Sequence, residues 1–146
     1  MTKEFILAGV LMKRLLSGAD TDGQFCLFEN QSDGASRTPI HVHADDDETI
    51  YMMEGEMQAI VGGQTKIVRA GETLLLKRGI PHQLMNVSGA QMHYILLCTP
   101  SGFDGFVAEG GREREEGAEI APPTPEDIAR MKSAAPRFGI TLMQNW

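Results

Sequence analysis

The segment PIHVHADDDETIYMMEGEM, residues 39–57, contains two histidines, His41 and His43, separated by a single residue. Four residues lie between the second histidine and Glu48, and six more lie between this glutamate and Gly55. Side chains at positions i and i+2 of a strand point to the same face of the sheet. If PIHVH is a strand, the two imidazoles therefore project together and are placed to share one ion, and Glu48 can turn in beside them.

A third histidine, His82, is placed to complete this set at the expected start of the strand HQLMN. Three neutral imidazoles and one carboxylate favour one divalent transition metal ion, namely Fe, Mn, Ni, Cu, Co or Zn. Ca²⁺ and Mg²⁺ are excluded because they prefer ligand shells made of oxygen. Asp45, Asp46 and Asp47 are the alternatives to Glu48, although an acidic turn is usually a solvated loop.

The first hundred residues show a succession of short strands separated by turn residues. The segments QFCLFE, ETIYMME, MQAIV and QMHYILLC are rich in alternating or β-forming residues, and Gly62-Gly63 predicts a tight hairpin. Two further strands are expected in the N-terminal segment EFILAGVLMKRLLSG. Strands at this spacing favour an antiparallel sandwich or barrel.

After residue 100 the strand-like alternation of residues gives way to helical and polar segments. SGFDGFVAEGG has the composition of a short helix, and REREEGAEIAPPT that of a polar loop. Thr124 and Pro125 then predict the N-cap and first residue of a helix that ends near Ala134, before Pro136. We expect one domain, in which residues 1–100 form a β-barrel with both histidine segments and residues 101–146 form a loop and helix packed on it.

Composition and charge limit the classes of partner. The chain has 146 residues, 13 of them basic and 20 acidic, and a net charge of −7. This charge disfavours nucleic acid and anionic membranes as partners, since both select basic surfaces. Glu4 precedes the signal-like N-terminal apolar run, and Lys13 and Arg14 interrupt it. We therefore expect a cytoplasmic protein, in which Cys26 and Cys98 are buried thiols rather than a disulfide.

The two histidine segments resemble the two sequence motifs of small single-domain cupins, and more narrowly those of bacterial quercetin 2,3-dioxygenase-like cupins. The first motif appears as HVHADDDETIYMMEG. The second appears as GETLLLKRGIPHQLMN, where the residues at the family spacing are Gly71, Gly79, His82 and Asn86. The similarity extends over most of the chain. It implies an all-β fold, a cupin jelly-roll barrel of antiparallel strands with a short C-terminal helical segment.

Two positions depart from the family pattern. Ala35 stands where the family has the first-motif glycine, with Gly34 one residue early, and Lys77 replaces the proline of the second motif. Both positions belong to expected loops or turns, so the departures leave the expected fold unchanged.

The resemblance also implies a function. His41, His43, Glu48 and His82 would bind the metal ion, and Glu48 would in addition act as the catalytic base. The implied activity is that of a dioxygenase acting on a flavonol-like or other enolisable aromatic substrate. Two alternatives remain open from the residues alone: a non-redox isomerase, cyclase or lyase that uses the same Lewis acid, and a cupin that binds a small molecule without turnover.

Strand alternation and motif position place further side chains near the expected site. They are candidates for lining the cavity or for hydrogen bonding to the ligands: Ile50, Met52, Leu84, Asn86 and His93. For Asn86 the alternative role is to cap a turn, and for His93 it is a position on the outer face of the barrel.

Two larger features remain as expectations. The polar loop around GGREREEGAE, within residues 110–123, is either a lid over the barrel mouth or a plain surface loop. The apolar segment FILAGVLM suggests a homodimer formed through the N-terminal strands.

Overall fold

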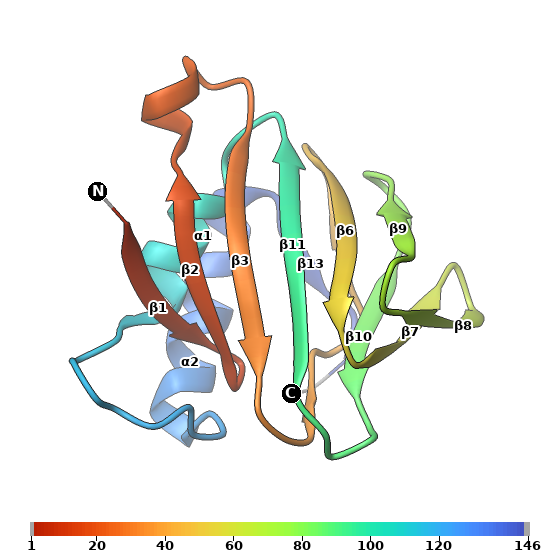
Figure 1. Ribbon diagram of the computed structural model, residues 1–146. Coiled ribbons are helices and arrows are strands. Elements are labelled where there is room, and N and C mark those ends of the chain that lie inside the picture. Colours follow the sequence, from red (N-terminus) through yellow and green to blue (C-terminus); the bar gives the residue numbers. More distant parts are fainter. Residues whose placement is uncertain (1, 145–146) are drawn as a thin grey trace.

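The computed structural model describes residues 2–144, which form two antiparallel β-sheets and two α-helices (Figure 1). In chain order the strands are β1 Lys3–Leu7, β2 Val10–Leu16, β3 Cys26–Ser32, β4 Ser36–Arg37, β5 His41–His43, β6 Asp47–Glu54, β7 Glu56–Val61, β8 Gln64–Arg69, β9 Thr73–Leu76, β10 His82–Asn86, β11 Met92–Thr99, β12 Arg112–Glu113 and β13 Ile140–Leu142. One sheet has the order β12-β1-β2-β3-β11-β6-β9, and the other β13-β5-β10-β7-β8, with β4 also paired to β10. The predicted all-β barrel of antiparallel strands is confirmed.

The core lies between the two sheets and follows the period-two pattern of the strands. Along β3 and β11, buried and partly buried side chains alternate from residue to residue. The largest fully buried apolar side chains come from both sheets: Phe28, Ile50, Met52, Met57 and Leu76. Because each strand contributes one face to this core, the register of every strand is fixed by its buried face.

Two glycine-containing turns hold neighbouring strands in register. Gly62 and Gly63 both have positive φ and join β7 to β8, as the predicted hairpin requires. Gly55 joins β6 to β7 with φ of 80°, and a Cβ atom there would overlap the carbonyl oxygen of Gln91. The glycine that ends the first histidine motif is therefore needed both for its backbone conformation and for lack of space.

The N-terminal strands β1 and β2 are formed as expected, but their apolar side chains are buried within a single chain. Phe5, Leu7, Val10 and Met12 are each less than a tenth exposed, and helix α1, Phe103–Gly110, packs against β1. These side chains do not offer an exposed apolar face, so the homodimer stays a prediction without support from this segment.

Helix α2, Pro125–Ala134, begins and ends where the sequence predicts. The side chain of Thr124 accepts a hydrogen bond from the backbone N–H of Asp127, whose carboxylate accepts one from the backbone N–H of Thr124. This capping box satisfies two backbone donors of the helix start. A 3₁₀ turn at Ala135–Phe138 follows, and α1 and α2 pack against each other.

The region after residue 100 also contributes two short strands that the sequence analysis did not predict. β12 pairs with β1, and β13 pairs with β5 through Ile140 opposite His43 and Leu142 opposite His41. The C-terminal segment thus belongs to the sheet that carries the histidine pair, besides contributing the helices. Two or three residues are too few for a periodic signal, so the sequence pattern does not show these strands.

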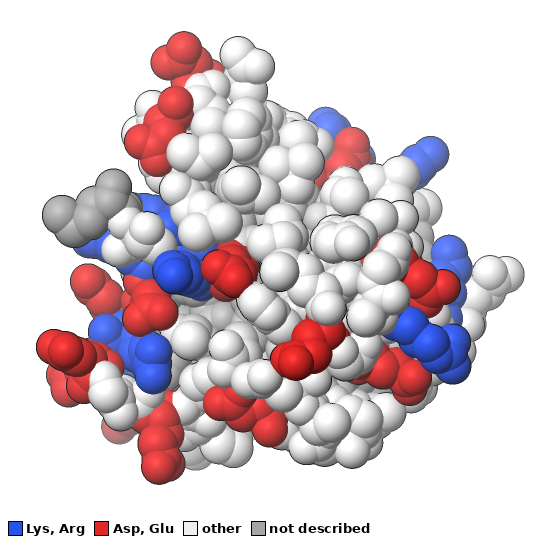
Figure 2. Space-filling view, viewed as in Figure 1, with Lys and Arg blue, Asp and Glu red and all other residues white. Residues whose placement is uncertain are grey.

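Charged residues are distributed over the surface without a continuous basic area on the face shown in Figure 2, where acidic and basic side chains lie close together. No helix within residues 2–144 is long and apolar enough to cross a membrane.

Candidate metal centre

The four predicted ligands come together between the two sheets. His41 and His43 lie on β5, Glu48 near the start of β6, and His82 opposite His41 at the start of β10. One ligand atom from each of the four residues lies within 4.8 Å of every other. His43, Glu48 and His82 are buried, and His41 is partly buried. His41 and His82, 41 positions apart in sequence, are thus neighbours because β5 and β10 pair.

Each of the three imidazoles is oriented by a hydrogen bond at Nδ1. The acceptors are the carbonyl oxygen of Pro39 for His41, at 2.8 Å, and that of Ile80 for His82, at 3.2 Å. For His43 the acceptor is a carboxylate oxygen of Asp46, at 3.1 Å. A neutral ring with its proton on Nδ1 presents the Nε2 lone pair to the centre of the cluster, which is the arrangement seen for histidine ligands of metals.

The atoms that face the centre lack hydrogen-bond partners. Nε2 of His43, Nε2 of His82 and Oε1 of Glu48 are all buried and without a hydrogen bond, although Oε1 lies 3.1 and 3.2 Å from the two nitrogens. Two atoms bound at right angles, about 2.1 Å from one ion, would lie about 3 Å apart. The buried orphan atoms and their spacing therefore fit a shared transition metal ion.

The protonation states of the ligands reflect burial and mutual charge. Burial, helped by the charge of His82, lowers the pKa of His41 to about 4, so this ring is neutral near pH 7. Burial opposes ionisation of Glu48 and would raise its pKa. The nearby imidazoles have the larger effect, with His43 contributing most, and they lower the pKa of Glu48 to about 2. Burial likewise opposes charging of His43, and the carboxylates of Glu48 and Asp46 outweigh it, so its pKa is raised. A metal ion would take the place of the His43 proton.

The three aspartates between the motif histidines and Glu48 have different positions. Asp46 is buried and hydrogen bonds to His43. Asp47 binds the backbone N–H and the guanidinium of Arg78, and Asp45 is exposed. Only Asp46 therefore supports a ligand, whereas the sequence analysis treated the three aspartates only as alternatives to Glu48.

We expect an Asp46→Ala variant to bind the metal about 10–100-fold more weakly than the parent protein. The physical reason is that the His43 ring loses the acceptor that holds its orientation and makes Nε2 more basic. Competition titration against a chromophoric chelator measures the affinity, and Asp45→Ala is the matched control because Asp45 is exposed in the same turn. Equal affinity in the Asp46→Ala and Asp45→Ala variants would contradict this role.

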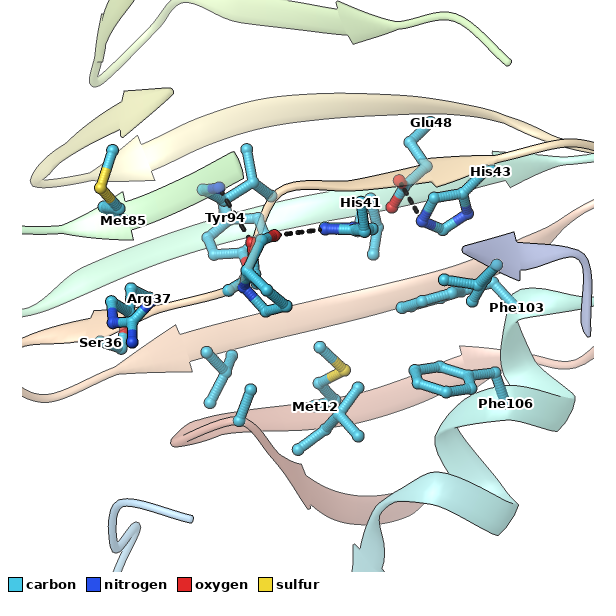
Figure 3. A pocket seen from close by; sticks show the side chains of 18 of the residues that line it. Met12, Ser36, Arg37, His41, His43, Glu48, Met85, Tyr94, Phe103 and Phe106 are labelled. Atoms are coloured by element: carbon cyan, nitrogen blue, oxygen red, sulfur yellow. Dashed lines mark hydrogen bonds and ion pairs between the residues drawn. The ribbon is translucent and has the colours of Figure 1, made fainter. Parts of the chain in front are cut away.

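A cavity begins at the metal centre and continues through the barrel interior (Figure 3). Its polar lining consists of Ser36, Arg37, Thr38, His41, His43, Glu48 and Tyr94. Its apolar lining is larger and includes Leu7, Val10, Met12, Leu84, Met85, Met92, Leu96, Phe103, Phe106, Ile140 and Leu142. The lining contains no residue from the 110–123 loop, and the start of that loop lies along β1 instead.

The additional residues predicted around the site occupy several different positions. Leu84 lines the cavity, whereas Ile50 and Met52 are fully buried in the core and do not line it. Asn86 donates to the carbonyl oxygen of Ala90 and so fastens the turn after β10. His93 is half-buried outside the cavity, with Nε2 2.7 Å from a carboxylate oxygen of Glu29.

Cys26 and Cys98 lie directly opposite each other on β3 and β11, although they are 72 positions apart in sequence. Both are free and fully buried. Burial raises the pKa of the Cys98 thiol, and Cys26 and Glu48 raise it further. The two residues are thus buried thiols, as expected, but their proximity became visible only with the strand order.

Comparison with known proteins agrees with this architecture. Residues 28–98 match the family model of the cupin domain, a range that contains both histidine motifs. The fold is that of a cupin. No curated protein matches the chain closely enough to count as a relative.

Solved structures with the same cupin fold have different described activities. A predicted oxalate decarboxylase from Thermotoga maritima has a TM-score of 0.61 at 18% identity, over 68% of this chain and 92% of that one. The polyketide cyclase RemF from Streptomyces resistomycificus has a TM-score of 0.57 at 24% identity, over 66% and 70%. A sugar phosphate isomerase from Silicibacter pomeroyi has a TM-score of 0.55 at 19% identity, over 64% of this chain and only 61% of that one. These identities establish a shared cupin fold and leave the reaction open.

Proposed function

We propose that the protein is a metal-dependent dioxygenase that acts on a flavonol-like or other enolisable aromatic substrate. The observation that carries this proposal is that three of the four clustered ligands, His41, His43 and Glu48, line a cavity whose remaining wall is mainly apolar. The apolar wall would contact the ring of an aromatic molecule whose oxygen atoms face the metal centre. The resemblance of both motifs to those of quercetin 2,3-dioxygenase-like cupins supports the same substrate class.

The residues of the site have distinct roles in this proposal. The metal, when bound, would supply Lewis-acid stabilisation of the enolate and, if redox-active, a route for reaction with dioxygen. Among the described residues, Glu48 carries the only carboxylate that lines the cavity, and it serves as the base that accepts the enol proton. Phe103 and Phe106 form part of the wall, where they contact the aromatic ring and exclude water.

The titratable side chains of the cavity favour this reaction over a non-redox isomerase, cyclase or lyase. Those reactions commonly use one group to remove a proton and another to return it. Apart from the metal ligands and Arg37, Tyr94 is the one titratable side chain in the lining that residues 2–144 provide. Burial raises the pKa of Tyr94 to about 12, and Glu48 contributes to the shift. A phenol with this pKa stays protonated near pH 7 and can donate a hydrogen bond, so Glu48 is the carboxylate of the lining that is available to accept an enol proton.

Oxygen uptake tests the proposal. Protein loaded separately with Fe, Mn, Ni, Cu, Co or Zn is mixed with a flavonol in an oxygen electrode, and product is analysed for incorporated ¹⁸O. We expect consumption of one O₂ per flavonol with a redox-active ion, and incorporation of both oxygen atoms. The metal-free protein and the His82→Ala variant should be inactive, and His93→Ala should keep the parent rate because His93 lies outside the cavity.

Two outcomes would overturn the dioxygenase. Metal-dependent conversion of an enolisable substrate under strict exclusion of oxygen would establish the non-redox alternative. Tight binding and unchanged release of the ligand, with no turnover for any of the ions, would establish a binding protein.

A further inference from the structure

The outer face of the seven-stranded sheet is the side of the molecule that neither helix covers within residues 2–144. Figure 1 views the molecule from this side, with β3, β11 and β6 in front and both helices behind them. The loop that follows β12 reaches this face at one edge, where it lines a groove with Leu11 and Gln31. The strands further from that edge therefore present their outward side chains directly to solvent.

A row of apolar side chains crosses this outer face. Side chains of paired residues point to the same face of a sheet, and the register places Leu97 of β11 between Leu27 of β3 and Thr49 of β6. The row continues to a leucine at each end, Leu16 on β2 and Leu75 on β9. Four leucines and one threonine thus lie side by side on five neighbouring strands.

A second row beside the first adds two large apolar side chains, Ile95 on β11 opposite Tyr51 on β6. Tyr51 is 47% exposed and Leu75 of the first row 51% exposed. The segment YILLC of β11 is apolar at every position, which is typical of a strand that is buried on both faces. A contiguous apolar area of this kind indicates an interaction surface. We call these seven side chains of the two rows the outer patch.

The charges around the outer patch include both signs. Lys13 lies opposite Glu29 on one side, and on the other side Asp47, two residues before Thr49 on β6, pairs with Arg78 at 3.2 Å. Figure 2, which has the same viewpoint, shows uncharged side chains over the upper central part of this face. A partner with charge of one sign would be matched by a border of the opposite sign. A mixed border instead fits a second copy of the chain, which offers the same two signs.

Twofold symmetry makes a further demand that the outer patch meets. Residues near the axis of a symmetric dimer contact their own copies in the partner. A charged residue there would meet a like charge, which costs several kcal/mol. The five residues of the first row are all uncharged, so the middle of the patch can face itself.

The area of the face is sufficient for a specific contact. Five strands about 4.8 Å apart occupy a width of about 24 Å, and strands of seven or eight residues such as β3 and β11 are about 25 Å long. The product is about 600 Å². Specific interfaces cover about 600–1,000 Å² on each partner.

We propose that the outer face of the seven-stranded sheet is the interface of a homodimer, in which the outer patches of two copies pack against each other about a twofold axis. The contact resembles the packing of two sheets in a sandwich, with about 10 Å between them. It buries the exposed parts of Tyr51 and Leu75. It is distinct from a dimer through the segment FILAGVLM, whose strand β1 lies toward the opposite edge of the sheet.

Sedimentation velocity of the full chain, at concentrations from about 1 to 100 µM, tests the proposal. We expect the parent protein to sediment as a dimer. Leu97→Lys introduces two like charges into the middle of the contact and should weaken the dimer at least about a hundredfold. Leu75→Lys should also weaken it, and this change has little effect on folding because half of the Leu75 side chain is exposed.

Ile67→Lys is the matched control. Ile67 is an exposed apolar residue, 38% accessible, on β8 of the other sheet, so this variant should dimerise as the parent does. Circular dichroism of each variant shows whether it is folded.

Three results would overturn the proposal. A parent protein that stays monomeric at about 100 µM leaves the outer patch to a different partner. A dimer that neither Leu97→Lys nor Leu75→Lys weakens is formed through another surface. A dimer that Ile67→Lys weakens as much as Leu75→Lys does responds to added charge in general and does not depend on this face.

Discussion

A His82→Ala variant is expected to fold but to gain much less stability from a divalent transition metal than the parent protein does. A metal that binds only the native state adds about 2.7 kcal/mol to the free energy of unfolding when its free concentration is 100 times Kd. His82 contributes one of the four ligand atoms, and its Nε2 is buried without a hydrogen bond. Without it, His41, His43 and Glu48 form an incomplete and weaker site.

Urea unfolding followed by circular dichroism, with and without the metal, measures this difference. His93→Ala is the control, because it removes a histidine that pairs with Glu29 outside the ligand set, and the metal should stabilise it as much as the parent. Equal stabilisation of His82→Ala and His93→Ala would show that the metal binds elsewhere.

A Phe28→Ala variant is expected to lose about 3–5 kcal/mol of stability, the usual cost of removing a buried phenylalanine from a core. Phe28 lies on β3 and is fully buried. Its ring meets that of Phe103 edge to face, with centroids 6.2 Å apart, and Phe103 in turn lies 5.6 Å from the ring of His43. Phe28 therefore supports the aromatic contacts that connect Phe103 of α1 to the metal centre.

Denaturant midpoints of metal-free protein measure the loss without the contribution of the ion. Tyr51→Ala removes an aromatic side chain of similar size that is 47% exposed on β6, and it should change stability by only about 0.5 kcal/mol or less. If both variants lose the same stability, Phe28 is not part of a close-packed core as described.

The sequence predicted those parts of the molecule that depend on local pattern. Alternating side chains in QMHYILLC and QFCLFE correspond to β11 and β3, and Thr124 caps α2 as its position before Pro125 indicated. The spacing within HVHADDDE predicted the ligand set because the i and i+2 positions of β5 fix two imidazoles relative to each other. These features need only a few neighbouring residues.

Features that depend on the pairing of distant segments were not predicted. Ser36 was recognised as a cavity residue only from the pairing of β4 with β10. The pairing of β13 with β5 joins residues 140–142 to residues 41–43, which are about a hundred positions apart in sequence. The sequence cannot distinguish Asp46 from Asp45 and Asp47, because the three aspartates are consecutive. Only the path of the turn directs the Asp46 carboxylate to His43.

The central claim is that His41, His43, Glu48 and His82 bind one transition metal ion. Elemental analysis of the purified parent protein and of the His41→Ala/His82→Ala double variant tests it most directly. The account predicts about one transition metal ion per parent chain and none in the double variant, after both are reconstituted under the same conditions and freed of excess metal. A parent chain that holds no metal after reconstitution, or a double variant that holds as much as the parent, would contradict it.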